Sequence, residues 1–169
     1  MNEILDAWNG TDAEVAAATL LSCCASQRWA RAVAAQRPYA TADDLFETAG
    51  RVWAAMDEHD WLEAFRAHPR IGERKAAHAT PQSAQWSRQE QFAANAAEQT
   101  VLDELADGNR RYEELYGFTY IVCATGKSAE EMLQILRRRL ASDRQSELRE
   151  AAEQQRQITQ IRLRKWLEI

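Results

Sequence analysis

The sequence holds few of the residues that interrupt helices or cross-link chains. Among 169 residues there are six glycines, three prolines and three cysteines. Glycine and proline destabilise helix interiors. The alternation of apolar and polar residues that is typical of half-buried strands is almost absent, whereas Ala, Glu, Gln, Arg and Leu are abundant. The composition therefore predicts an all-α protein.

Other features that the sequence lacks argue against several classes of protein. An odd number of cysteines, two of them adjacent at Cys23 and Cys24, opposes a disulfide framework and predicts reduced thiols in the cytoplasm. No apolar run approaches the roughly 20 residues that span a bilayer, and the first residues do not resemble a signal peptide. The net charge of −5 argues against a nucleic-acid binder. Nucleotide-binding and metal-binding motifs are absent, so we expect no such cofactor.

The organisation of the chain follows from helix-start patterns. The length fits one domain, residues 1–169. Capping boxes predict helix starts at Thr11…Glu14, Thr41…Asp44, Ser87…Glu90 and Ser128…Glu131. The polar segment Arg70–Trp86 predicts a long loop and candidate lid, and Gly117–Cys123 predicts a buried irregular segment. We expect a single-domain helical bundle of about seven to nine helices, with the long loop after the corner His68-Pro69-Arg70-Ile71-Gly72.

His68 lies at the end of a predicted amphipathic helix that includes Trp61–Phe65. Pro69 has no backbone N–H and disfavours a helical residue before it, so the helix ends here. The exposed carbonyls of a helix C-terminus favour a protonated imidazole. His68 is therefore a candidate general acid or base, and the alternative is that it only caps the helix.

Arg162 lies on the apolar side of a predicted helix from about Ser142 to Lys165. At 100° per residue, Ile158, Arg162 and Trp166 are successive neighbours along one apolar stripe. Because buried arginine is rare without a partner, an inward guanidinium indicates binding. The alternative is an arginine whose stem packs while its head reaches water.

Glu90 is expected on the apolar side of a helix that begins near Arg88. The apolar residues of that helix would be Ala94, Ala97, Val101, Leu105, Tyr112 and Tyr116. The simplest role of Glu90 is to cap the helix by bonding the backbone of Ser87. An inward carboxylate at a helix N-terminus can also bind a ligand, beside N–H groups that attract anions or carbonyls. An imidazole, a carboxylate and a guanidinium that all face inward predict a pocket for a small, polar, anionic molecule.

Other polar residues receive simpler interpretations. His59 and Glu63 are four residues apart on a helix and are expected to be a solvated pair, not metal ligands. Cys24 and Cys123 are expected to be buried, inert thiols. The run Arg137-Arg138-Arg139 has acidic neighbours and is expected to form a solvated helix face.

Several short motifs occur in a fixed order. They are Cys24-x-Ser26-x-x-Trp29, Arg37-Pro38, Phe65-x-Ala67-His68-Pro69-Arg70-Ile71-Gly72, Ser87-x-x-Glu90-Gln91, Asn109-x-x-Tyr112, Gly117-Phe118-x-Tyr120-Ile121 and Ile158-Thr159-x-Ile161-Arg162-Leu163. Together they resemble the 2-oxo-4-hydroxy-4-carboxy-5-ureidoimidazoline (OHCU) decarboxylase family over nearly the whole chain. One departure is Phe92-Ala93-Ala94, where the family pattern has a glycine-containing stretch.

The resemblance implies an all-α carboxy-lyase of purine catabolism. It implies decarboxylation of OHCU to (S)-allantoin, the last step from urate to allantoin, by a cytoplasmic homodimer. It implies no metal, no organic cofactor, no nucleic acid and no membrane partner. By position, His68 and Glu90 would be catalytic. The implied substrate contacts are Pro69, Ser87, Gln91, Ile121, Val122, Cys123, Ala124 and Arg162.

The implied chemistry explains the lack of a cofactor. The carboxylate of OHCU leaves from a carbon next to a ring C=N, and this imine receives the electron pair. His68 would transfer the proton, Glu90 would bond the hydroxyl or ureido group, and Arg162 would anchor substrate oxygens. Two rival functions are a non-enzymatic helical interaction module and a different lyase or hydrolase that shares the pocket.

Overall fold

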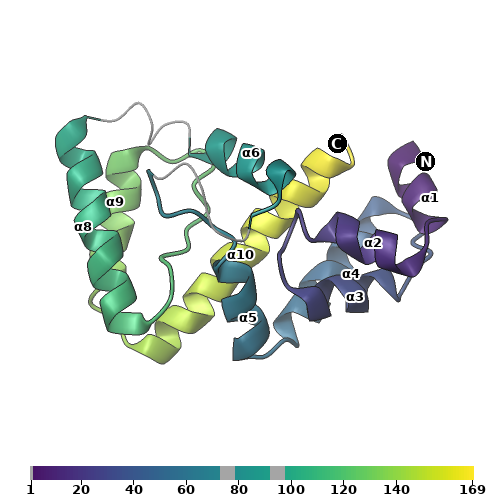
Figure 1. Cartoon of the computed structure of the whole chain (residues 1–169), viewed down its shortest axis with the longest axis horizontal. Helices are drawn as coiled ribbons and strands as arrows, with labels where there is room; N and C mark the ends of the chain where they lie inside the picture. Colours follow the sequence, from purple (N-terminus) through teal and green to yellow (C-terminus); the bar gives the residue numbers. More distant parts are fainter. Residues whose placement is uncertain (1, 73–78, 92–97) are drawn as a thin grey trace. The chain divides into compact units, whose positions relative to one another are not determined.

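The computed structural model describes residues 2–72, 79–91 and 98–169. This part of the chain forms nine α-helices and no β-strand, which confirms the all-α prediction (Figure 1). None of the described helices is long and apolar enough to cross a membrane. The helices divide between two compact units, Met1–Ala64 with Arg156–Ile169, and Phe65–Gln155. That both units belong to one domain stays a prediction.

The first unit contains short helices from the N-terminal part and the end of a long one. They are α1 (Glu3–Asn9), α2 (Ala13–Leu20), α3 (Gln27–Ala34), α4 (Ala42–Ala54) and α5 (Glu58–Phe65), whose last residue already belongs to the second unit. The long helix is α10 (Arg144–Trp166), which belongs to the first unit from Arg156 onward. Helix α3 packs against α2 and α4. Its Trp29 is fully buried, and the indole N–H donates to the Ala49 carbonyl at 3.0 Å. That bond lets a large amphipathic side chain lie in the core.

The second unit contains α6 (Pro81–Glu90), α8 (Gln99–Tyr116), α9 (Ala129–Arg139) and the start of α10. Helices α8 and α9 lie side by side (Figure 1). Helix α8 ends at Gly117, whose φ of 81° is the left-handed conformation that glycine adopts at little cost. The irregular segment that follows is buried at Phe118 and from Tyr120 to Ala124, which confirms the prediction for this region.

Aromatic rings hold this irregular segment in place. The Phe118 ring lies 5.7 Å from both Tyr112 and Phe65, measured between ring centroids. The Tyr120 ring lies 5.5 Å from that of Tyr112, which is fully buried in α8. These contacts fix the chain between α8 and α9 without hydrogen-bonded secondary structure.

Two of the predicted capping boxes are confirmed. Thr41 with Asp44 caps α4, and Ser128 with Glu131 caps α9, with both reciprocal bonds present. The predicted box at Thr11 is wrong. The adjacent Asp12 caps α2, while the Thr11 hydroxyl donates to the Trp8 carbonyl.

The predicted long loop Arg70–Trp86 is wrong from Pro81 onward, and its residues 73–78 lie outside the described part of the chain. Helix α6 already begins at Pro81, and the Thr80 hydroxyl accepts the Ser83 N–H at 3.1 Å as its N-cap. Proline is well suited to the first helical position because its N–H would have no intrahelical partner there. The part of the Arg70–Trp86 segment from Pro81 onward is therefore helical.

This helix also changes the place of Ser87 and Glu90. Both lie in the last turn of α6, so the predicted capping box and helix start near Arg88 are wrong. The expected anion site at a helix N-terminus is wrong for the same reason. Ala94 and Ala97 of the predicted helix lie outside the described residues.

Candidate active site

The His68 corner lies at the start of the second unit. Helix α5 ends at Phe65, and the His68 N–H donates to the Phe65 carbonyl at 3.1 Å. His68 is half-buried, and the neighbouring Pro69 is buried. The predicted helix end is thus confirmed, with one further turn between the helix and the imidazole.

A buried glutamine orients the imidazole of His68. Its Nε2 lies 2.6 Å from Oε1 of Gln155, a residue of α10 that is 0% exposed. Because an amide oxygen only accepts, this contact requires Nε2 to be the donor. The sequence reasoning missed Gln155. Its position on the stripe between Ala151 and Ile158 was the available signal.

The preceding residue of α10 holds the irregular segment. Gln154 Oε1 accepts the Cys123 N–H at 2.8 Å, and Lys127 Nζ donates to the Cys123 carbonyl at 2.7 Å. One turn of α10 therefore bonds both the His68 ring and the segment Ile121–Ala124. All four residues of that segment are buried.

The end of α6 is tied to the same corner. Gln91, which directly follows α6, accepts the Gly72 N–H through Oε1 at 3.0 Å. Gln91 and Ser87 are buried, and Glu90 is half-buried. Arg70 forms a bidentate pair with Glu113 of α8 at 2.6 and 2.8 Å, which fixes the corner on a second helix.

Within the second unit, hydrogen bonds made by these residues or by their neighbours link three groups of the predicted site residues. These groups are the corner at His68, the end of α6, and the segment Ile121–Ala124. Glu90 lies one residue before Gln91, the residue that bonds the corner. The linked groups combine an imidazole, a carboxylate and backbone amides, which suits proton transfer to a small molecule with amide groups.

Arg162 lies in the first unit, on the end of α10. It is 4% exposed, which confirms that it faces inward, and Nη1 lies 3.5 Å from the Ser22 carbonyl. Its charge also acts on Cys23 and Cys24. Burial raises the pKa of each thiol to about 12, and the Arg162 charge offsets only part of that effect.

These thiols stay protonated at physiological pH, so the prediction that Cys24 is buried and inert holds. Cys123 is also buried, as expected.

The free energy of unfolding is expected to fall as the pH rises above about 8.5, where cysteines of an unfolded chain ionise. The folded thiols of Cys23 and Cys24 keep their protons up to about pH 12, so the native state binds more protons in this window. Linkage then lowers stability by roughly 1.4 kcal/mol per pH unit for each thiol. Urea unfolding at about pH 7.5 and about pH 9.5, before unfolded tyrosines ionise, measures the effect.

The control for this pH dependence is the variant Cys23→Ala/Cys24→Ala. It should lose less stability than the wild type between the two pH values, because both buried thiols are gone. An identical loss in both proteins would contradict the prediction.

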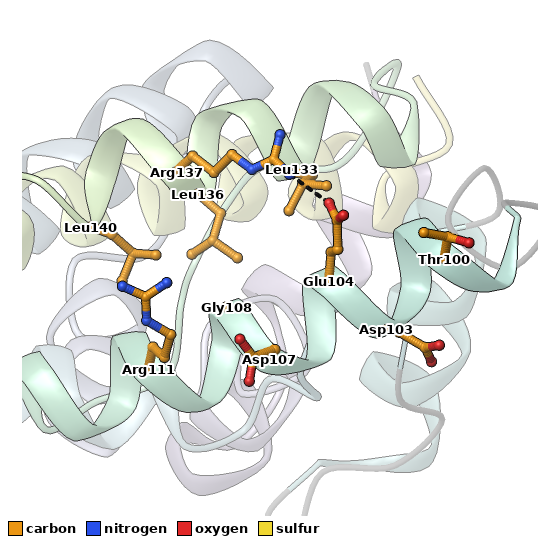
Figure 2. A pocket seen from close by; sticks show the side chains of 10 residues that line it. All are labelled: Thr100, Asp103, Glu104, Asp107, Gly108, Arg111, Leu133, Leu136, Arg137 and Leu140. Carbon is orange, nitrogen blue, oxygen red and sulfur yellow. Dashed lines mark hydrogen bonds and ion pairs between the residues drawn. The ribbon is translucent and has the colours of Figure 1, made fainter.

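A surface pocket of about 380 Å³ lies between α8 and α9 (Figure 2). It is lined by Leu133, Leu136 and Leu140 and by charged residues that include the ion pair of Arg137 with Glu104. The two helices approach closely at Gly108, where an added Cβ would lie 2.6 Å from Leu136 Cδ2. No predicted site residue lines this pocket.

Asp57, His59 and Asp60 bring three possible metal ligands together at the start of α5. Arg28 already pairs with both carboxylates, at 3.3 Å to Asp57 and 2.9 Å to Asp60. Glu63 accepts the Gln27 N–H at 2.7 Å, so its carboxylate caps α3. These side chains therefore connect α3 with α5, and they lie in the first unit.

Arg139 corrects the expectation for the arginine run. Arg137 and Arg138 are exposed, but the Arg139 side chain is 3% exposed and pairs with Glu147 at 2.7 Å. Its spacing from Met132 and Leu136 places it on the buried face of α9, and this periodicity was the signal that the flanking acidic residues obscured.

Comparison with known proteins gives one consistent result. A model of the OHCU decarboxylase family matches residues 9–164. The chain is 36% identical over 147 residues to the uric acid degradation bifunctional protein TTL of Arabidopsis thaliana, covering 85% of this chain and 44% of that protein. It is 32% identical over 141 residues to the 2-oxo-4-hydroxy-4-carboxy-5-ureidoimidazoline decarboxylase of Amia calva, covering 79% and 77% of the two chains.

Solved structures agree. A crystal structure of OHCU decarboxylase in the presence of (S)-allantoin matches with a TM-score of 0.77 and 32% identity, over 94% of this chain and 100% of that one. A crystal structure of (S)-allantoin synthase, 17% identical with a TM-score of 0.72, shares the fold over 96% of this chain and 53% of that one. The chain spans less than half the length of the bifunctional plant relative.

Proposed function

The chain belongs to the OHCU decarboxylase family, and on that premise we propose that it decarboxylates OHCU to (S)-allantoin. The observation that carries the proposal is the turn of α10 at Gln154 and Gln155. Gln155 bonds the His68 imidazole and Gln154 bonds the peptide segment Ile121–Ala124, which supports a reaction that combines proton transfer with amide recognition.

The reaction needs little from the protein beyond position, charge and one proton. The bond between the ring carbon and its carboxylate breaks, carbon dioxide leaves, and the electron pair moves into the adjacent ring C=N. The ring nitrogen takes up a proton, which leaves an enol on the carbon that lost its carboxylate. This enol becomes the ring carbonyl when its O–H proton is lost and a proton is delivered to one face of the adjacent, former imine carbon, which sets the S configuration. Because the substrate carries its own electron sink, the proposal includes no cofactor and no metal.

His68 is the proposed proton carrier. The contact of Nε2 with Gln155 holds the imidazole in one orientation for proton exchange with the substrate. Glu90, at the end of α6, is the proposed partner that bonds the hydroxyl or ureido group of the substrate. Ser87, Gln91 and Pro69 are proposed contacts beside it.

Arg162 is the proposed anchor for substrate oxygens. Its burial at 4% exposure supports this role, because a buried guanidinium gains most from an anionic or carbonyl partner. Backbone groups of Ile121, Val122, Cys123 and Ala124 complete the proposed substrate contacts.

The proposal also covers the oligomeric state, the compartment and the metabolic step of the enzyme. We propose a cytoplasmic homodimer that acts at the end of urate conversion to allantoin, without nucleic-acid or membrane partners. Cys23, Cys24 and Cys123 are free thiols, which supports a compartment in which thiols stay reduced.

The decisive experiment generates OHCU in place from urate with urate oxidase and hydroxyisourate hydrolase. Circular dichroism then follows allantoin formation with and without the protein. We expect rapid formation of the S enantiomer, well ahead of the spontaneous decay of OHCU. Racemic product at the spontaneous rate would refute the proposed activity.

A further inference from the structure

A buried arginine holds the carbonyl oxygen of Ile121. Arg139, the last residue of α9, donates to this oxygen through Nη1. Its Nε donates to Glu147 Oε2 at 2.7 Å and its Nη2 to the Tyr112 hydroxyl oxygen at 3.2 Å. The Tyr112 hydroxyl in turn donates to Glu147 at 2.6 Å. The guanidinium is therefore fixed by three partners from different parts of the second unit.

Aromatic faces complete this environment. The guanidinium carbon of Arg139 lies 4.9 Å from the ring centroid of Tyr120 and 5.6 Å from that of Tyr112. Burial raises the pKa of both tyrosines, so they remain neutral hydroxyls beside the ion pair. Arginine suits this position because a planar guanidinium offers several donors in a rigid arrangement, which a lysine ammonium does not.

The two bonds to Cys123 act on the next peptides. Gln154 accepts its N–H, and Lys127 donates to its carbonyl. The peptide units on both sides of Val122 thus each have one group bound by a side chain: the Ile121 carbonyl by Arg139 and the Cys123 N–H by Gln154.

Peptide geometry then determines where Val122 directs its own groups. A planar trans peptide directs its C=O and N–H to opposite sides. The Val122 N–H therefore points away from Arg139, and the Val122 C=O points away from Gln154. Within the described part of the chain neither group forms a hydrogen bond, although Val122 is only 6% exposed. Buried backbone groups nearly always have a partner.

We propose that Arg139 is a positioning residue that, with Gln154 and Lys127, aims the N–H and C=O of Val122 at an amide of the substrate. The inference rests on the proposed function. A ureide supplies both complements, a carbonyl for the Val122 N–H and an N–H for the Val122 carbonyl. The ion pair with Glu147 holds the Arg139 guanidinium in place, and Nη1 of Arg139 then fixes the Ile121 peptide.

The test compares Arg139→Lys with the wild type. Lysine keeps the charge beside Glu147 but loses the fixed geometry that reaches the Ile121 carbonyl at the same time. We expect KM for OHCU and Kd for (S)-allantoin to rise about tenfold, the equivalent of one oriented hydrogen bond. The value of kcat per folded molecule should change much less. A purely structural role would lower the folded fraction and leave KM unchanged.

Arg37→Lys is the matched control. Arg37 also holds backbone carbonyls, with Nη1 2.7 Å from Trp8 O and Nε 2.9 Å from Ala34 O, but it lies in the first unit. It should lose stability without a change in KM. If Arg139→Lys does not fold, the variant Lys127→Met tests the proposal instead. Lys127 is half-exposed, and its replacement releases only the Cys123 carbonyl. The Lys127→Met variant should also raise KM for OHCU several-fold.

A direct readout is the backbone ¹⁵N–¹H signal of Val122 during titration with (S)-allantoin. It should shift in the wild type and shift less in Arg139→Lys. An unshifted Val122 signal in a wild type that binds allantoin, or unchanged KM in both Arg139→Lys and Lys127→Met, would overturn the inference alone. A wild type without activity and without allantoin binding would instead refute the proposed function, and the inference with it.

Discussion

Replacing His68 with asparagine is expected to slow enzymatic (S)-allantoin formation by roughly 10²- to 10⁴-fold, the range for loss of a general acid–base group. Asparagine is polar and fits within the space of the imidazole, but its amide nitrogen reaches only the place of Nδ1, so the contact of Nε2 with Gln155 Oε1 is lost together with the proton carrier. It cannot exchange a proton near neutral pH. The loss should therefore fall on kcat, with the fold intact. The coupled urate assay, followed by circular dichroism, measures it.

His59→Asn is the matched control for this variant. His59 is an exposed histidine of α5 in the first unit and should be replaceable without effect on the rate. Full activity of His68→Asn would exclude His68 as the proton carrier, even if the protein is a decarboxylase. Reduced activity in both variants would point to a loss of α5 rather than to the chemistry of His68.

Replacing Glu147 with leucine is expected to lower the free energy of unfolding by roughly 3–5 kcal/mol, the cost of breaking a buried ion pair from one side. Arg139 would remain buried with its charge uncompensated, and the Tyr112 hydroxyl would lose its acceptor. Leucine fills a similar volume, so a cavity contributes little to the loss. Urea denaturation at neutral pH, with the same m-value in both proteins, measures the difference.

Glu104→Leu provides the comparison. Glu104 also pairs with an arginine, Arg137, but both side chains are about half exposed, at 47% and 52%. Water already screens this pair, so its loss should cost less than about 1 kcal/mol. If the two variants lost equal stability, burial would not be the source of the effect. A Glu147→Leu protein as stable as the wild type would show that the network of Arg139 is dispensable for folding.

The features that sequence reasoning predicted are those with a local cause. The caps at Thr41 and Ser128, the helix end before His68 and the irregular segment after Gly117 each follow from a few adjacent residues. The inward direction of Arg162 follows from the period of its own helix. The error at Ser87 and Glu90 has a local cause as well, because Thr80 and Pro81 start a helix earlier.

The features that sequence reasoning missed depend on contacts between distant elements. Gln155 lies 87 residues from His68, and the burial of Arg139 depends on Glu147 from α10 and Tyr112 from α8. A capping pattern or a hydrophobic period describes one helix at a time. It therefore cannot identify a partner residue that lies on another helix. Acidic neighbours in the sequence made Arg139 look solvated, although its actual carboxylate partner lies on another helix.

The sequence by itself determined the all-α class, some helix ends, the ordered motifs and the choice of His68 and Arg162 as candidates. These depend on short-range sterics, on caps and on periodicity, which a linear pattern records. Tertiary structure alone decided which nitrogen of His68 faces Gln155 and which groups hold Ile121 and Cys123. The physical reason is that a buried polar group must find its partner in three dimensions, wherever the chain supplies one.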